Sequence, residues 1–356
     1  MIRFDQGAPV RTPIVPGTRA KATSKDVARL AGVAQSTVSY YMNGSRPVSK
    51  NASARIEAAM KALDYHPNSS ARTLRTQRTN LITLIERLSY DSVGSDVIPY
   101  MTTIIEEAYR LGYDVILNTT KADPNSLTRM EGRNICDGFI LMDIEADDSR
   151  IPVAAEIGLP TVVFGQPRDS HGLDCVYFDY AHAGGLIVDY LAAHGTHQVL
   201  FLDELADGSG RFLYIRRLYD AMRERCAAHG MDFAVVPFDE RDIPAVLEAI
   251  SERIGDRLAI VTRQPQPTKT IMFALERLGV VPGQDLTLLS ICPDSRLEGF
   301  ETKPTNISQM PREVSVTALH TLIDRINDPG RPQVIRPVRA DHVTTRETTV
   351  DFRRRT

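Results

Sequence analysis

The chain of 356 residues is too long for one small domain, and its 42% hydrophobic and 24% charged residues are ordinary for a globular protein. Its net charge of −3 hides a segregation: residues 19–78 carry 11 Lys and Arg against 3 Asp and Glu, whereas the rest carries 31 against 42. No stretch approaches the roughly 18 consecutive apolar residues of a membrane span, and residues 1–20 have no apolar signal core. We therefore expect a cytoplasmic protein with no membrane partner, whose basic segment meets a polyanion.

Known catalytic and metal-binding motifs are missing from the sequence. It contains no GxxxxGK[ST], GxSxG or HExxH pattern. The nearby His194 and His197 are expected at a helix-to-strand turn, where a solvated or capping role is commoner than catalysis. We therefore predict no enzyme, no cofactor and no metal. The cysteines are too far apart for a zinc site and are interpreted as free buried thiols of a reducing cytosol: Cys136, Cys175, Cys226 and Cys292.

Three short helices are expected within residues 21–66, after a loose arm of residues 1–20. Thr23 followed by Asp26 predicts an N-terminal cap, and Gly32 ends the first helix. A second helix is expected from about Gln35 to Asn43. Ser49 can cap a third, whose apolar residues follow the i, i+3, i+4, i+7 pattern: Ile56, Ala59, Met60 and Leu63.

The second helix carries an outward polar set that core packing does not explain. A helix that enters the DNA major groove needs a bracing helix, short polar side chains and nearby cations that hold phosphates. This pattern predicts a helix-turn-helix domain with double-stranded DNA as partner, and a small solvated helical bundle is the plain alternative. The outward residues are Gln35, Ser36, Ser39 and Tyr40, and the cations are Lys21, Lys25, Arg46, Lys50 and Arg55.

A polar, basic hinge at residues 67–79 separates this head from an α/β body at residues 80–350. A helix around residues 70–75 is too short to be stable alone in water. In the body, short apolar runs alternate with helical patterns, which predicts parallel sheets with helices on both faces, arranged as two similar lobes. Strands are expected at 81–85, 115–117, 139–142, 161–164, 199–202, 258–261 and 286–290, and helices at 100–111, 181–194, 215–229 and 269–278.

Residues 22–76 closely resemble, without a gap, the DNA-binding head of the lactose-repressor/galactose-repressor (LacI/GalR) family of bacterial transcriptional regulators. The body resembles this family more loosely. The resemblance implies an α/β fold with an N-terminal three-helix head, a hinge helix and a two-lobe body like a periplasmic binding protein. The matching pieces are Asp26-Val27-Ala28, Ala31-Gly32-Val33, Thr37-Val38-Ser39, Asn43-Gly44, Val48-Ser49, Arg55-Ile56, Ala59-Met60, Leu63-Asp64-Tyr65 and Pro67-Asn68.

The resemblance also implies roles in DNA binding. Gln35, Ser36 and Tyr40 would face base edges, and Leu74 would wedge into the minor groove. The family often has Arg where Tyr40 stands; Arg reads guanine bidentately and Tyr cannot, so a different operator half-site is expected. Ala34 replaces a usual Ser, so the second helix lacks a side-chain cap. The remaining DNA-binding residues are Ser24, Lys25, Thr37, Ser39, Asn43, Ser49, Tyr65, Asn68 and Arg72.

For the body, the resemblance implies a small-molecule effector in a cleft between two lobes. Lobe 1 would comprise about 80–166 and 291–328, and lobe 2 about 167–290 and 329–350. The Gly184-Gly185 pair is expected to permit close helix–strand packing. The family's usual sugar-contacting residues are replaced here, so the ligand is a carbohydrate recognised differently, another metabolite or none. Candidate effector contacts are Gln166, Arg211, Arg216, Arg217, Arg263, Gln264 and Asp294.

Together these features predict a dimeric, sequence-specific DNA-binding transcriptional regulator. We expect a repressor that binds a pseudo-palindromic operator and is modulated by an effector. Dimers are favoured over tetramers because no leucine heptad follows the body. The alternative function is a cytosolic small-molecule-binding α/β protein, or a regulator with no effector response.

Overall fold

The computed structural model describes residues 22–43, 46–65, 78–87, 94–119, 123–203 and 211–355. The chain divides into two compact units, a head within residues 1–77 and a body of residues 78–356, and each is considered by itself. The expected arm of residues 1–20, and Asn68, Arg72 and Leu74 of the hinge, lie outside the described residues.

The head consists of α1 (Ser24–Ala31), α2 (Gln35–Asn43) and α3 (Lys50–Ala62). The predicted caps are confirmed: Thr23 and Asp26 form a reciprocal capping box on α1, and the Ser49 side chain accepts from the backbone of α3. Gly32 ends α1 in the left-handed conformation, at φ 62°. The helices enclose a small core of Val27, Ala28, Ala31, Val38, Ile56, Ala59 and Tyr65.

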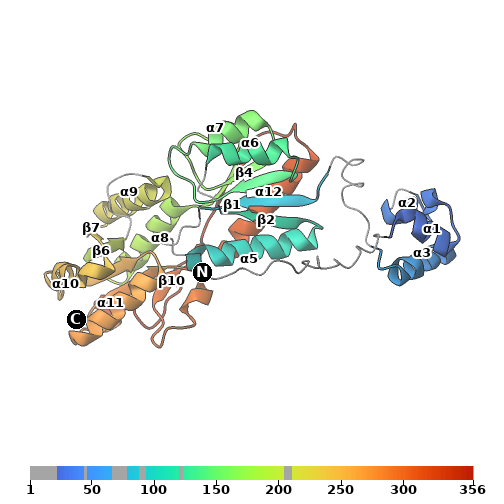
Figure 1. Ribbon diagram of the computed structural model, residues 1–356. Coiled ribbons are helices and arrows are strands. Elements are labelled where there is room, and N and C mark those ends of the chain that lie inside the picture. Colours follow the sequence, from blue (N-terminus) through green and yellow to red (C-terminus); the bar gives the residue numbers. More distant parts are fainter. Residues whose placement is uncertain are drawn as a thin grey trace, which may run out of the picture. The chain divides into compact units, whose positions relative to one another are not determined.

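Two separate parallel sheets form the body (Figure 1). The first has the strand order β11-β5-β4-β3-β1-β2 and the second β10-β9-β8-β6-β7. The strands of the first sheet are β1 (Leu81–Ile85), β2 (Asp114–Asn118), β3 (Gly138–Leu141), β4 (Thr161–Phe164), β5 (Asp174–Phe178) and β11 (Ile335–Val338). Those of the second are β6 (Gln198–Asp203), β7 (Asp232–Pro237), β8 (Leu258–Thr262), β9 (Thr287–Ile291) and β10 (Thr305–Ile307).

Helices cover both faces of the first sheet (Figure 1). On one face, α5 (Gly94–Arg110) and α12 (Pro311–Asn327) pack on Leu84 and its neighbours. On the other, α6 (Pro124–Gly132) and α7 (Arg150–Ile157) pack on the next residue, Ile85. Successive strand residues point to opposite faces, and helices cover both faces of this sheet. Leu84 and Ile85 are therefore both buried, and the strand is mostly apolar along its length.

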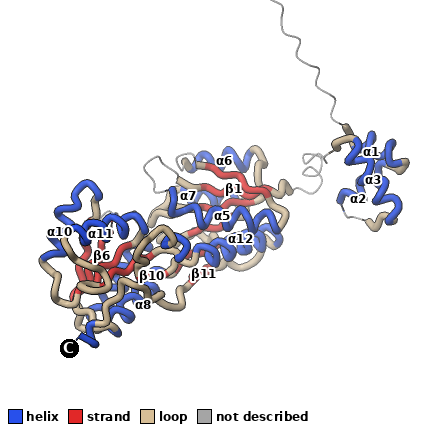
Figure 2. The backbone as a smooth tube through the Cα atoms, turned by 90° about the horizontal axis from the view of Figure 1, so that it is seen from below, coloured by secondary structure: helices blue, strands red, loops and turns tan. Residues whose placement is uncertain are grey.

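The second sheet is built in the same way (Figure 2). Helices α8 (Tyr180–Ala193) and α9 (Leu213–Ala228) share the core that contains Phe201, while α10 (Ile243–Ser251) and α11 (Pro265–Arg277) share the core that contains Leu202. A Cβ on Gly184 would lie 3.1 Å from the Leu218 carbonyl of α9. This glycine therefore permits close packing of two helices, which corrects the helix–strand packing expected from the sequence.

The sheets also correct the expected lobe boundaries. Strand β5 belongs to the first lobe rather than the second, β10 belongs to the second rather than the first, and β11 belongs to the first rather than the second, while β9 lies in the second lobe as expected. Within the described body, the chain crosses between lobes at about 179, at 308–310 and at 339–343. The sequence does not single out β5 and β11; β5 pairs with the preceding strand β4, whereas β11 pairs with β5, which lies far from it along the chain.

A buried ion pair anchors the returning chain in the first lobe. The Asp174 side chain accepts from Arg325 Nε at 3.0 Å and Nη2 at 2.8 Å, and from the backbone N–H of Val334 at 2.7 Å. It thereby joins β5, α12 and the segment that leads into β11. Such a carboxylate is stable in the interior because a guanidinium balances its charge and both of its oxygens accept hydrogen bonds.

Candidate DNA interface and effector cleft

The outward face of α2 carries side chains that are already oriented by their neighbours. Gln35 is exposed, and its Nε2 donates to Ser24 Oγ at 3.1 Å, which links the start of α2 to the start of α1. Ser36 is exposed beside it. Because Gln and Ser are short polar side chains, this end of α2 can approach base edges, and the bond to Ser24 limits the rotamers of Gln35.

One turn further along α2, Tyr40 interacts with an arginine. The Arg46 guanidinium lies over the Tyr40 ring, 5.2 Å from its centroid. Among the described residues, Arg46 has no acidic partner. A guanidinium that stacks through its face keeps the N–H groups at its edge available for planar acceptors. The stack therefore places a donor-rich group beside the tyrosine that replaces the family's usual arginine.

The other predicted DNA-binding residues are in varied settings. Lys25 is exposed on α1, while Thr37 and Ser39 are partly buried on α2. Ser49 caps α3, which uses its side-chain oxygen. Tyr65 is 9% exposed and belongs to the head core, so packing accounts for it without a contact to DNA.

In the body, the functional candidates gather where strands of both sheets end. Glu86 follows β1, Gln166 follows β4, and Arg263 follows β8, while Asp203 is the last residue of β6. Open parallel sheets bind ligands outside the carboxyl ends of their strands. Two backbone and side-chain bonds between the loop after β3 and the segment before α9 bring the two edges together: Ala146 N donates to Arg211 O at 2.8 Å and Arg211 Nε donates to Glu145 Oε1 at 2.8 Å.

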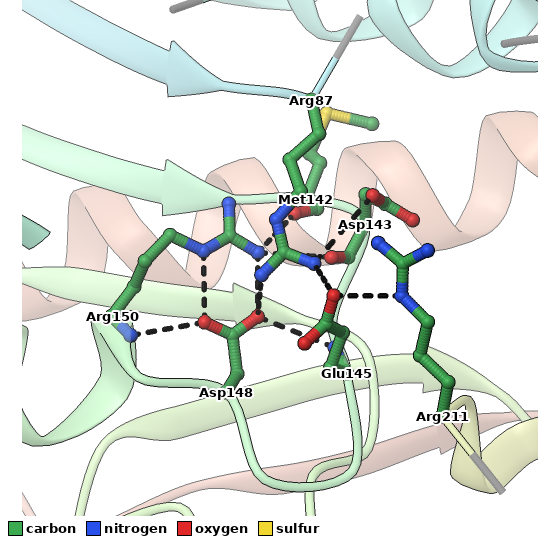
Figure 3. A network of polar contacts seen from close by, with 7 residues as sticks. All are labelled: Arg87, Met142, Asp143, Glu145, Asp148, Arg150 and Arg211. Atoms are coloured by element: carbon green, nitrogen blue, oxygen red, sulfur yellow. Dashed lines mark hydrogen bonds and ion pairs between the residues drawn. The ribbon is translucent and has the colours of Figure 1, made fainter. Parts of the chain in front are cut away.

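A charge network occupies the first lobe's side of this junction (Figure 3). Arg150 is 1% exposed; its Nε and Nη2 donate to the Asp148 carboxylate at 2.9 and 2.7 Å. Arg87 bonds both Asp148, at 2.8 Å, and Glu145. Burial raises the pKa of Asp148, but hydrogen bonds with Arg150 and the charges of Arg150 and Arg87 outweigh burial, so its pKa is lowered.

Two buried polar atoms in this region have no hydrogen-bond partner among the described residues, Glu86 Oε2 and Arg150 Nη1. Burial, and then the charge of Asp143, raises the pKa of Glu86 to about 7. Burial likewise raises the pKa of Asp143, against the opposing charge of Arg87. The site thus contains an acid whose charge changes near neutrality and a donor and an acceptor that a polar group could satisfy.

The second lobe contributes aromatic rings and a buried ion pair. Arg263 Nε donates to Asp203 Oδ1 at 3.1 Å, and the Tyr219 hydroxyl donates to the same carboxylate. The rings of Tyr214 and Tyr180 lie 4.8 Å apart. Burial, opposed by the charge of Arg263, raises the pKa of Tyr214, and Asp143 of the first lobe also raises it. The charges of groups from both lobes therefore act on Tyr214.

The seven effector candidates do not form one cluster. Arg211 and Arg263 belong to the junction, whereas Asp294 accepts from Arg346 Nη2 at 2.7 Å and from Asn306 Nδ2 at 3.0 Å. Gln264 precedes α11, and its buried Oε1 has no partner among the described residues. Arg216 and Arg217 are exposed on α9, and Arg216 lies 3.9 Å from Asp220. Gln166 is partly buried after β4.

Sequence reasoning missed most of the junction. Glu86, Arg87, Asp143 and Asp203 each stand at or just after the end of a buried strand, and this position was the signal that could have found them. Tyr214 and Tyr219 lie on a helix instead, and only tertiary contacts identify them. Where the chain is described, no group of three side chains could hold a metal ion, and no helix is long and apolar enough to cross a membrane.

A basic helix-turn-helix head joined to a two-lobed body with a polar, aromatic junction is the architecture of a DNA-binding regulator with a small-molecule-binding domain. Residues 23–68 match the model of the bacterial regulatory proteins of the lacI family, and residues 188–349 match that of the periplasmic binding protein-like domain.

Individual proteins agree with these matches. The chain is 28% identical over 322 residues to the ribose operon repressor of Escherichia coli (strain K12), covering 88% of this chain and 95% of that one. The lac repressor dimer bound to operator and the anti-inducer ONPF has the same fold, with a TM-score of 0.76, 19% identity and coverage of 93% and 100%. A transcriptional regulator CelR–cellobiose complex gives a TM-score of 0.63, with 20% identity and coverage of 92% and 100%. The chain thus joins a lacI-family DNA-binding head to a periplasmic-binding-protein-like domain, which is the domain composition of LacI-family transcriptional regulators, proteins that are not enzymes.

Substitutions in the head should separate base reading from phosphate binding. Tyr40→Arg supplies a bidentate guanine contact and should change the preferred base in each half-site. Lys25→Ala should weaken binding to all sequences alike and reduce the salt slope by about one, because a phosphate contact carries no base information. Selection of bound duplexes from a random pool, with titrations at several salt concentrations, measures both. Identical base preferences in wild type and Tyr40→Arg would exclude base reading at this position.

Glu86 should make the body less stable as the pH rises. Its folded pKa of about 7 exceeds the ordinary 4.5, so its contribution is complete below pH 4.5 and is lost as the pH rises through 7. The whole contribution is about 3 kcal/mol, of which about 2 kcal/mol should be lost between pH 5.5 and pH 8, because part of it is already lost at pH 5.5. Urea unfolding of the full-length protein at pH 5.5 and 8 should show this loss in the body transition, and Glu86→Gln should abolish most of it. The exposed Glu131→Gln is the matched control, and an unchanged pH dependence in Glu86→Gln would contradict the assignment.

Proposed function

We propose that this protein is a repressor that binds a pseudo-palindromic operator as a homodimer, and that a small molecule in the junction between its lobes modulates this binding. The setting is the bacterial cytoplasm. The single observation that supports operator reading best is the exposed start of α2, where Gln35 is held by Ser24 within a basic head. A surface helix that only needed to be solvated would not require an oriented amide at that point.

A carbohydrate is the first effector class to test. The ribose operon repressor and the CelR–cellobiose complex carry sugar names. The junction supplies carboxylates, which accept from hydroxyl groups, and the rings of Tyr180 and Tyr214, which offer apolar faces. Glu86, Asp143, Asp203, Arg211 and Arg263 are the side chains that we assign to this site, ahead of Gln166, Gln264 and Asp294. The exposed Arg216 and Arg217 are the weakest candidates.

The homodimer proposal is supported by an apolar stripe on α5. Ile98, Ile105 and Tyr109 are 56%, 46% and 77% exposed, and their spacing of seven and four residues places them on one side of the helix. The neighbouring β2 adds Leu117, 42% exposed. A second copy is the occupant that a two-fold symmetric operator requires, since each half-site takes one head. In the dimer, paired hinges would let Leu74 enter the minor groove.

The head should carry essentially all DNA affinity. Deletion of residues 1–77 should leave a folded body that no longer shifts duplex DNA, because the remaining residues are acidic on balance. Full-length protein should bind operator with a steep salt dependence, measured by gel shift and by fluorescence anisotropy. The double variant Gln35→Ala/Ser36→Ala controls for loss of the head's fold: it should keep non-specific binding and lose preference for operator. Full-length protein without salt-dependent retention on DNA would favour a small-molecule-binding protein instead.

A charge on the apolar stripe should weaken dimerisation. Tyr109→Asp buries an uncompensated carboxylate if this surface is the interface, so the dissociation constant measured by sedimentation equilibrium should rise at least tenfold. Thr128→Asp adds the same charge at an exposed position on α6 and should leave the dissociation constant unchanged. Equal behaviour of the two variants would place the interface elsewhere.

A further inference from the structure

Besides the apolar cluster that they share, the two lobes are joined by polar contacts between one loop and one helix end. The loop follows β3 and contains Glu145 and Ala146, and Arg211 stands just before α9. The backbone N–H of Ala146 donates to the carbonyl of Arg211 at 2.8 Å, and Arg211 Nε donates to Glu145 Oε1 at 2.8 Å. The chain's own atoms make this bridge, and a motion that separates the lobes at this point breaks both bonds.

Glu145 is held in place on its own lobe before it meets Arg211. Its second strong partner is Arg87, and its backbone N–H donates to Asp148 Oδ2 at 3.2 Å. Asp148 has a fully buried side chain and is fixed by Arg150 (Figure 3). A pre-positioned carboxylate loses less rotamer freedom when it forms an ion pair. The bridge is therefore stronger than a contact between two freely rotating surface side chains.

The bridge also remains open to solvent on one side. The Arg211 side chain is 54% exposed and that of Glu145 is 29% exposed. Ion pairs with this exposure are weak and screened by salt. A bond of this kind can be broken in ordinary thermal opening, which a fully buried pair would not permit. An ion pair of this strength and exposure can shift the equilibrium between two lobe positions without preventing either one.

We propose that the Glu145–Arg211 pair is a latch between the lobes, which sets the ratio of closed to open body and hence the response to effector. Only the claim about the response to effector rests on the proposed function; the claim that the pair is a latch does not. A ligand shifts a two-state body by its differential affinity for the two states. The latch stabilises the closed state relative to the open state. Its strength therefore sets how large the difference in effector affinity between the two states must be to switch the protein.

Hydrogen exchange of the Ala146 amide reports the latch without DNA or effector. This amide is bonded across the lobes and its residue is 4% exposed, so opening should release it. We expect Arg211→Gln to speed exchange of the peptide that contains Ala146 by about two- to fivefold, the size that a weak ion pair permits. Raising salt should speed exchange in the wild type and have little effect in Arg211→Gln. Arg211→Lys, which keeps the charge, should recover part of the protection.

A matched control lies in the same loop. Asp147 pairs with Arg168 at 2.9 Å, and both residues belong to the first lobe. Asp147→Asn removes one charge beside the latch without touching the contact between lobes, so it should exchange like the wild type. Equal exchange in Arg211→Gln and wild type would overturn the latch. Equally fast exchange in Asp147→Asn and Arg211→Gln would also overturn it, because local fraying of the loop would then explain both.

The claim that the latch sets the response to effector is tested by a separate measurement. Operator affinity and the effector concentration at half-response, with ribose and cellobiose as the first probes, should both shift at least twofold in Arg211→Gln and stay unchanged in Asp147→Asn. A faster Ala146 exchange with unchanged operator affinity would reduce the pair to a structural contact and overturn the regulatory claim. Absence of operator binding in the wild type would defeat the proposed function, while the exchange result would still decide whether the latch exists.

Discussion

Burial of the Arg150 guanidinium is the constraint on which the junction between the lobes depends. A charge taken out of water needs partners, and Arg150 obtains them for Nε and Nη2 from Asp148 and from the carbonyls of Met142 and Asp143, the latter at 2.8 and 2.9 Å. These bonds fix the loop after β3. The loop in turn presents Glu145 to the other lobe. The position of Glu145 at the junction thus depends on the buried ion pair between Arg150 and Asp148.

Parallel sheets explain why so much chemistry gathers at this edge. Each strand enters the junction at its carboxyl end, and its apolar run must stop where the helices no longer cover it. Thr262, Ser290 and Thr268 mark this transition in the second lobe, where their hydroxyls bond one another inside the protein. Beneath the polar edge, a single apolar cluster extends from Leu84 to Phe201 and joins the two lobes. The lobes therefore share a hydrophobic base and meet above it through charges.

The parts that the sequence predicts well are those decided by near neighbours. Thr23, Gly32 and Ser49 act within three residues of themselves, so the head's helices and caps follow from local chemistry. The buried runs near Leu84 and Ile260 are visible as continuous apolar segments for the same reason. Long-range pairing is different: β11 carries exposed residues, and only its register with β5 makes it a strand. Tyr214 likewise shows nothing unusual on its own helix. Its importance depends on Asp143 and Asp203, which come from other segments of the chain.

The segregation of charge determines which part of the molecule is attracted to DNA. A chain of net charge −3 would gain little from a phosphate backbone if its charges were evenly mixed. With the cations concentrated in residues 19–78, the head attracts phosphates while the acidic remainder is repelled by them. DNA phosphates repel the acidic body whatever the base sequence. This repulsion opposes contact between the body and the duplex, so non-specific binding is confined to the head. At the junction, Arg87, Arg211 and Arg263 are already paired with carboxylates, which an anionic ligand would have to displace. This balance of charge is a physical reason to test uncharged effectors first.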